Sequence, residues 1–363
     1  MGCPGGWQVA HTNPIRRRAA YCPQECVPLI IRASVRGNPL LQDVKIFDAG
    51  RAVLEDYLDS TVYPAHLTIT ESQPLADALA AQTITPETHL LTFENDGIFH
   101  AIPMTIVICY NVIQGTTNGK PWMMTFCNAC NTGMVFDPAL DGQTLHFHRW
   151  GSYDGLLLIW DAETGSYWQH ITGQCLHGPS QGRQLRMITT TRQMNAAEAA
   201  ARQDSILLTS TLSPEQIAYS GFANRMRNNP ARVEAGILYT IAQEDTRRPR
   251  FELGLGVWSA SRSIFYPLVT LHTRDNALIT TFEGRPLLVY QSPAAIAPVA
   301  GYVAASRAMW EGDMLRLDGG AYIQNDLYFS SDGQSKPIER PTQLLMRWYG
   351  FALTFPGCDV LTL

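Results

Sequence analysis

The chain has 363 residues, of which 45% are hydrophobic and 16% are charged, and its formal net charge is -5. This length allows two domains with separate cores, while the acidic balance argues against the basic face that nucleic-acid binding requires. No apolar run approaches the roughly 20 residues of a membrane-spanning helix. We therefore expect no nucleic-acid partner and no transmembrane segment, and the composition identifies no other partner.

Residues 1–60 are predicted to form a poorly ordered N-terminal segment, because Gly, Pro, Arg and Cys mix there with weak hydrophobic periodicity. The basic run Arg16-Arg-Arg18 is interpreted as part of a solvated tail. No signal-peptide region is recognisable at the N-terminus. The sequence therefore leaves the compartment unknown.

A regular pattern of strands begins near Thr88. The apolar runs 90–93 and 98–102 flank Asn95-Asp-Gly97, which predicts a β-hairpin. Pro103 is expected to begin a helix over 104–114. A second hairpin is expected to turn at Asp141-Gly142. The remaining predicted elements are strands at 122–126, 134–136, 145–147, 156–160, 185–188 and 206–208, and a helix at 195–203.

The second half of the chain repeats the first in degraded form. Pro103 and Pro121 are 18 residues apart, and their counterparts Pro267 and Pro286 are 19 residues apart, with similar apolar runs around each proline. We predict an α+β fold that is predominantly antiparallel β, with a few short helices and two tandem copies of a β-rich unit. The copies are placed at 61–215 and 235–363, with a loop at Ser213-Pro214 near the boundary.

The most specific chemistry lies in Cys127-Asn-Ala-Cys130, which follows an apolar strand and precedes a turn. Two cysteines at this spacing suit half of a zinc site, a copper thiolate pair or a redox dithiol. They also suit a structural disulfide or two packed thiols. No βαβ pattern surrounds the motif, so a thioredoxin-like arrangement is disfavoured.

A second cluster follows in His170-Ile-Thr-Gly-Gln-Cys175-Leu-His177. Cys175 and His177 alternate, so on a strand both side chains would point to one face. With Cys127 and Cys130, the three residues provide enough thiolate and imidazole groups for a tetrahedral metal site. The alternative is a hydrogen-bonded loop histidine and a buried cysteine. In the second copy Ser292-Pro-Ala-Ala295 stands near the place of the paired cysteines, so the fold itself does not require them.

The other cysteines and histidines carry weaker signals. Cys109 is interpreted as a buried small hydrophobic residue. His146 and His148 are expected to share a solvated or partly stacked strand face rather than to bind a metal. The remaining cysteines have no shared pattern and comprise Cys3, Cys22, Cys26 and Cys358.

The order and spacing of these motifs resemble the family called domain of unknown function 3179. The resemblance rests on Gly97 to Pro103, on Gly119-Lys-Pro121, on the run around Cys127 and Cys130, and on the run from Glu163 to Pro179. It covers residues 85–210 closely and 250–363 more weakly. The resemblance implies proteins that are mostly bacterial and archaeal and often exported, but it implies no activity.

This sequence departs from the family in one place. In many members the helix after the proline carries a His, often with a Glu, whereas Cys109 and Asn111 occupy that region here. If that histidine is a ligand or a base in the family, its chemistry is altered in this chain.

Three functional hypotheses follow from the cysteines. The favoured one is a metal-binding protein that uses Cys127, Cys130 and Cys175 with His170 or His177 to bind copper or zinc. The second is an oxidoreductase in which Cys127 and Cys130 cycle between dithiol and disulfide. The third is a non-catalytic interaction module with structural cysteines. Whether the protein is an enzyme stays open, but both metal binding and redox cycling require the Cys127–Cys130 turn to lie against the segment 170–177.

Overall fold

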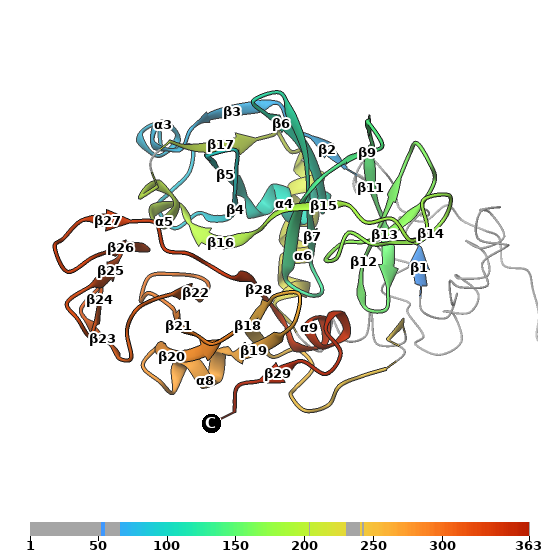
Figure 1. Ribbon diagram of the computed structural model, residues 1–363. Coiled ribbons are helices and arrows are strands. Elements are labelled where there is room, and N and C mark those ends of the chain that lie inside the picture. The colour runs from blue at the N-terminus through green and yellow to red at the C-terminus, as the bar shows by residue number, and fades with distance from the viewer. Residues whose placement is uncertain (1–51, 55–65, 203, 230–239, 242, 363) are drawn as a thin grey trace, which may run out of the picture.

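The computed structural model describes residues 52–54, 66–202, 204–229, 240–241 and 243–362 (Figure 1). The predicted N-terminal segment 1–60 lies outside the described residues, apart from the short strand β1 (Ala52–Leu54). Among the helices of the described part, none is long and apolar enough to cross a membrane.

The described chain is rich in strands and mostly antiparallel, as predicted. Parallel pairs occur between β2 and β6, β5 and β17, and β19 and β29. The helices of this part are short, and they comprise α3 (Leu75–Ala80), α4 (Met104–Tyr110), α5 (Ala196–Ala200), α6 (Pro214–Arg227), α8 (Leu268–His272) and α9 (Trp348–Thr354).

The first half of the chain forms three larger sheets and one small hairpin. Sheet 1 has the order β16 (Arg192–Asn195), β4 (His89–Asn95), β5 (Ile98–Pro103), β17 (Ser205–Thr209) and β3 (Glu71–Pro74). Sheet 2 has the order β15 (Arg186–Thr190), β8 (Thr132–Asp137), β7 (Lys120–Cys127), β6 (Val112–Thr117) and β2 (Leu67–Thr68). Sheet 3 has the order β1, β11 (Phe147–Tyr153), β12 (Leu156–Asp161), β13 (Tyr167–Gln169) and β14 (Cys175–His177). The small hairpin pairs β9 (Ala139–Leu140) with β10 (Gln143–Thr144).

The second half forms three further sheets. The first has the order β28 (Thr342–Arg347), β18 (Leu253–Trp258), β19 (Ser263–Pro267) and β29 (Asp359–Val360). The next has the order β20 (Ala277–Phe282), β21 (Arg285–Tyr290) and β22 (Val299–Tyr302). The last has the order β23 (Ala308–Glu311), β24 (Met314–Leu317), β25 (Tyr322–Gln324), β26 (Leu327–Phe329) and β27 (Ser335–Lys336).

The two halves share a pattern of strand pairing. In sheet 1 the hairpin β4–β5 is flanked by β16 on one side and by the parallel strand β17 on the other. In the second half the hairpin β18–β19 is flanked in the same way by β28 and by the parallel strand β29. Each hairpin ends at a proline, Pro103 or Pro267, which directly precedes a short helix. A tandem duplication of one unit remains a prediction.

The core of the first half has two parts. One part surrounds α4, which lies between sheet 1 and sheet 2 (Figure 1). The other joins β7 and β8 of sheet 2 with sheet 3 and with the second half of the chain, and it contains Cys127, Cys130, Cys175, Trp168 and Trp348. The paired cysteines therefore lie where three parts of the structure meet.

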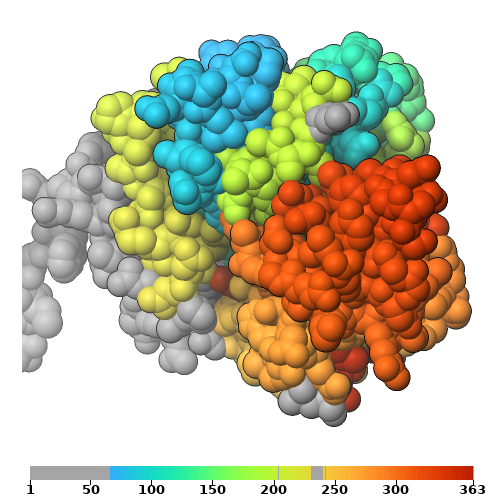
Figure 2. Space-filling model, turned by 90° about the vertical axis from the view of Figure 1, so that its left-hand side faces the viewer, coloured from blue at the N-terminus to red at the C-terminus, as the bar shows by residue number. Residues whose placement is uncertain are grey.

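The second half also packs against the first through a buried ion cluster. Asp326, between β25 and β26, binds Arg192 and Arg202 of the first half and Arg340 of the second. In the space-filling view the orange-to-red second half packs against the first half, whose blue and yellow-green residues lie beside it (Figure 2).

Three local predictions need correction. The helix predicted over 104–114 ends at Tyr110, because Asn111 adopts a left-handed conformation with φ of 62° and β6 begins directly after it. Ser213-Pro214, predicted as a loop, begins α6, where Ser213 and Gln216 form a capping box. The turn at Asp141-Gly142 joins β9 and β10 rather than the two predicted strands. The predicted helix over 195–203 is present as the shorter α5.

Candidate metal centre

The Cys127–Cys130 turn joins β7 to β8. Cys127 ends β7 opposite Thr132, and the backbone N–H of Asn131 donates to the Cys127 carbonyl at 2.8 Å. Asn131 has a φ of 62°, which asparagine tolerates better than most residues. This reversal brings the two cysteines face to face at the end of the hairpin.

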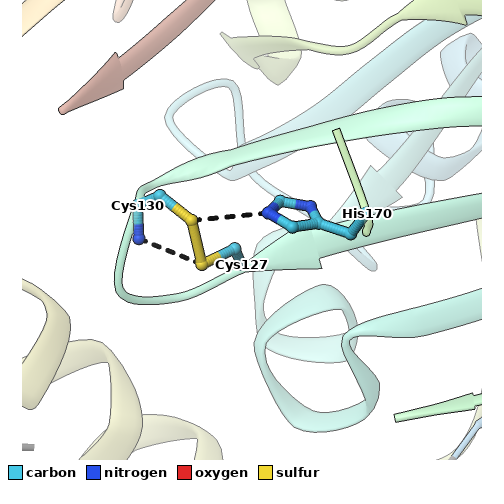
Figure 3. Close-up of side chains that lie close together, drawn as sticks. All are labelled: Cys127, Cys130 and His170. Carbon is cyan, nitrogen blue, oxygen red and sulfur yellow. Dashed lines mark hydrogen bonds between the residues drawn. A yellow bond between two sulfur atoms is a disulfide. The ribbon is translucent and has the colours of Figure 1, made fainter. Parts of the chain in front are cut away.

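Cys127 and Cys130 form a disulfide with a Cα–Cα distance of 5.4 Å (Figure 3). The backbone N–H of Cys130 also donates to Cys127 Sγ at 3.1 Å. Both cysteines are buried, with exposed fractions of 3% and 0%. The sulfur atoms are therefore shielded from solvent by the surrounding core.

His170 is the third member of the site. It follows β13 in a turn that the side chain of Gln169 holds, because Gln169 Oε1 accepts from the backbone N–H groups of Ile171 and Thr172. The His170 carbonyl accepts a hydrogen bond from Thr125 Oγ1 on β7 at 3.2 Å. These bonds fix the imidazole beside the disulfide, with His170 Nε2 at 3.5 Å from Cys130 Sγ (Figure 3).

The imidazole of His170 is neutral at ordinary pH. It is fully buried, and burial lowers its pKa from 6.5 to about 3, because a charged ring would lose its hydration. Its Nδ1 is buried without a hydrogen-bond partner in the described part of the chain. A neutral imidazole with Nε2 beside a sulfur atom is suited to bind a metal ion, whereas its low pKa makes it a weak proton acceptor.

The three side chains make a compact ligand set. Sγ of Cys127, Sγ of Cys130 and a ring nitrogen of His170 all lie within 4.8 Å of one another. The expectation that the Cys127–Cys130 turn meets the segment 170–177 is thus confirmed through His170. The sequence alone does not reveal this contact, because Cys130 and His170 are 40 positions apart in the chain.

Cys175 and His177 do not join this ligand set. Cys175 is buried on β14, where its Sγ–H donates to the His177 carbonyl at 3.4 Å, and burial raises its pKa to about 11. His177 stacks on Tyr167, with ring centroids 6.2 Å apart. A register shift between Tyr167 and Trp168 displaces β14 against β13. A role for these two residues as ligands therefore stays a prediction.

Two buried arginines, Arg347 and Arg227, donate hydrogen bonds to the Cys127–Cys130 turn and the residue after it. The backbone N–H of Arg347 donates to the Cys130 carbonyl at 3.0 Å, and its guanidinium donates to the Ala129 carbonyl at 2.6 Å. The Arg227 guanidinium donates to Asn131 Oδ1. Sequence reasoning missed both arginines. The available signal was weak: Arg347 stands in the apolar run Leu344-Leu-Met-Arg-Trp348.

These arginines carry charge that no carboxylate balances within the described chain. Arg227 and Arg347 are 6% and 5% exposed, and neither forms an ion pair there. Burial, and then the repulsion from Arg347, lower the pKa of Arg227 to about 10. Buried cations without a counter-charge are costly. The turn therefore lies in a markedly positive environment.

Asn111 lies in the region where many members of the resembled family carry a histidine, and here it has a structural role. Its Nδ2 donates to the Phe126 carbonyl at 2.9 Å, and its Oδ1 accepts from Arg149 at 3.1 Å. It thereby ties the end of α4 to β7 and β11.

Cys109, on the same helix, is fully buried, as predicted. Of the two predicted strand histidines, His148 lies on β11, while His146 precedes it.

The comparisons with known proteins place the chain in a family. A search of curated proteins and a search of solved structures found no match. The family model described as protein of unknown function (DUF3179) matches residues 69–352. This match includes Cys127, Cys130 and His170 and most of both halves. The chain therefore belongs to the DUF3179 family.

Proposed function

We propose that this protein binds a soft metal ion through Cys127, Cys130 and His170. The observation that carries the proposal is the compact set of two sulfur atoms and one imidazole nitrogen, all within 4.8 Å. The disulfide is the closed form of this site, because its sulfur atoms are bonded to each other. An external dithiol reductant, which is itself oxidised to a disulfide, supplies two electrons and two protons and converts the S–S bond to two thiols. Loss of the thiol protons on metal binding then gives two thiolate ligands.

Copper(I) fits this ligand set better than zinc. Structural zinc sites almost always have four ligands, and the described residues provide three in this group. Thiolates select soft ions such as copper(I). Zinc remains the other candidate, with a fourth ligand from solvent or from a residue that moves.

The charge of the surroundings supports a thiolate site. A copper(I) ion with two thiolates and a neutral imidazole carries one negative charge. Arg227 and Arg347, which hold the turn, provide positive charge that has no carboxylate partner in the described structure. The disulfide form leaves this charge uncompensated, whereas the metal form offsets part of it.

A second function, a dithiol oxidoreductase, is favoured by the disulfide itself. In this cycle a partner dithiol would supply two electrons and two protons, converting the disulfide of Cys127 and Cys130 to two thiols. His170 Nε2 lies 3.5 Å from Cys130 Sγ, but its low pKa makes it a weak base for the Cys130 thiol. The burial of both sulfur atoms also opposes this function, because exchange requires a thiolate to approach one sulfur directly.

The test is a copper(I) titration of the reduced full-length chain in the absence of oxygen. Cys3, Cys22 and Cys26 are replaced by serine in every sample, so that tail thiols do not compete. A chromophoric copper(I) chelator reports the affinity. We expect one tightly bound ion per chain, strong loss of binding in Cys127→Ser and Cys130→Ser, and weaker binding in His170→Gln.

Cys175→Ala is the matched control, because it removes a buried thiol outside the ligand set. It should bind copper(I) like the parent. Loss of copper(I) binding in this variant would show that Cys175 is a ligand. If the reduced parent fails to compete with the chelator, metal binding is refuted. Reversible exchange of the Cys127–Cys130 pair with a dithiol reagent would then favour the oxidoreductase. A change in stability alone in Cys127→Ser would favour the third hypothesis, a non-catalytic module.

We also propose that the two halves arose by duplication and that the metal site belongs to the first copy alone. The shared pairing of β4, β5, β16 and β17 with that of β18, β19, β28 and β29 supports this. A crystal structure of the full-length chain tests it. Close superposition of the two four-stranded sheets and of the helices after their prolines is expected, and a different pairing of β29 would count against the duplication.

A further inference from the structure

A second group of potential metal ligands lies outside the cysteine site. His66 directly precedes β2 of sheet 2, and His148 lies on β11 of sheet 3. Their Nδ1 atoms are 3.1 Å apart, although the two residues are 82 positions apart in the chain. The rings meet edge to face, with centroids 4.4 Å apart and an angle of 77° between the planes. The two histidines therefore connect the edge strand of sheet 2 to β11 of sheet 3.

The distance between these nitrogens suits a shared metal ion. Zinc binds imidazole nitrogen at about 2.0–2.1 Å, so two nitrogens in tetrahedral geometry lie about 3.3–3.4 Å apart. The observed 3.1 Å is close to this value. An ion between His66 and His148 would require the rings to separate by a few tenths of an ångström.

His146 provides a third imidazole, and Glu163 orients it. His146 Nδ1 lies 2.6 Å from Glu163 Oε1, and its backbone N–H donates to Glu163 Oε2 at 2.7 Å. A carboxylate that accepts from one ring nitrogen leaves the other nitrogen available for a metal, which is the usual arrangement around metal-binding histidines. His146 stands two residues before His148 in the chain, directly before β11.

We propose that His66, His148 and His146 bind a divalent ion of the zinc type, with Glu163 as the residue that positions His146. The ring nitrogens of the three histidines do not all lie within 4.8 Å of one another in the structure, so metal binding requires the 63% exposed His146 side chain to move toward the other two rings together with Glu163. Solvent then supplies the fourth ligand. The site contains nitrogen ligands only and is independent of the thiolate site. Because its ligands come from two sheets, bound zinc cross-links them.

The experiment is a calorimetric titration of the disulfide form with Zn²⁺. The full-length chain again carries serine at positions 3, 22 and 26, and the disulfide keeps Cys127 and Cys130 unavailable. We expect one ion per chain. His66→Gln and His148→Gln should each weaken binding by tenfold or more, and Glu163→Ala by about tenfold. His272→Gln, which removes an exposed histidine on α8, should bind like the parent.

The visible absorption spectrum of bound cobalt(II) is a second measurement, which distinguishes the histidine site from the thiolate site. Cobalt bound by imidazoles should show visible d–d bands without a sulfur-to-cobalt charge-transfer band, and reduction of the disulfide should leave these bands in place. Absence of Zn²⁺ binding by the disulfide form would reduce the His66–His148 contact to a hydrogen bond and would overturn the proposal. Equal affinity in His148→Gln, with its fold verified by circular dichroism, would do the same. Neither result would affect the copper(I) site.

Discussion

The buried carboxylate of Asp326 offers the clearest stability prediction. Its Oδ2 lies 2.6 Å from Arg192 Nη1 and also contacts Arg202, and its Oδ1 lies 2.9 Å from Arg340 Nη2 and accepts from the Tyr290 hydroxyl at 2.6 Å. Burial alone would raise the pKa of Asp326, but the three arginines outweigh it and hold the pKa well below its usual range. The carboxylate is thus the common partner of cations from both halves.

We expect Asp326→Asn to destabilise the protein by about 3–5 kcal/mol. The Asp326 side chain is 4% exposed, so its removal leaves buried arginines without their shared counter-charge, and breaking such pairs costs this much. The amide of asparagine also brings donor hydrogens toward the arginines. The exposed pair between Arg285 and Glu339 is the contrast, with side chains 49% and 64% exposed. Its loss in Glu339→Gln should cost about 0.2–1 kcal/mol.

Urea unfolding followed by circular dichroism and tryptophan fluorescence measures both variants. Because the cluster of Asp326 links the halves, we also expect the two probes to report separated transitions in Asp326→Asn, where the parent shows one. A free-energy change below about 1 kcal/mol, similar to that of Glu339→Gln, would refute the reasoning. It would mean that the arginines find other partners or water at little cost.

Two further predictions concern the core. Burial lowers the pKa of His100 to about 4 and that of His170 to about 3, below the value of 6.5 in the unfolded chain. The unfolded chain therefore binds more protons than the folded chain below pH 6.5, and the free energy of unfolding falls as the pH drops. The free energy of unfolding at pH 5 should be lower than at pH 7 by about 2 kcal/mol for each histidine. If His100→Asn keeps the same pH dependence of stability as the parent, burial of His100 is not its cause. A Cβ at Gly115 would lie 2.3 Å from Trp122 Cζ2, so Gly115→Ala should cost about 1–3 kcal/mol. A Cβ at Gly221 in α6 would make only an ordinary van der Waals contact, 3.6 Å from Arg225 Nη1, so Gly221→Ala should instead stabilise by about 0.5–1 kcal/mol. Thermal melts compare the two variants.

The sequence alone determined the elements whose signals are local. The turn at Asn95-Asp96-Gly97 forms as predicted, because Asp96 and Gly97 take the positive φ values of 53° and 77° that a tight hairpin needs. The strand-rich fold class and the position of the Cys127–Cys130 turn at a strand end follow from short-range patterns in the same way. Helix ends were less predictable, since a single left-handed Asn111 ended α4 early.

Only the tertiary structure decided which groups meet. His170 joined the cysteines while Cys175 and His177 did not, because the turn held by Gln169 and the register shift in β13–β14 place these neighbours differently. Arg347 reaches the turn from 217 residues beyond Cys130 in the chain, through the packing of the second half. Local patterns determine hairpins and strand ends because their energies depend on neighbouring residues. Ligand sets and charge environments depend on long-range packing, which residue spacing does not encode.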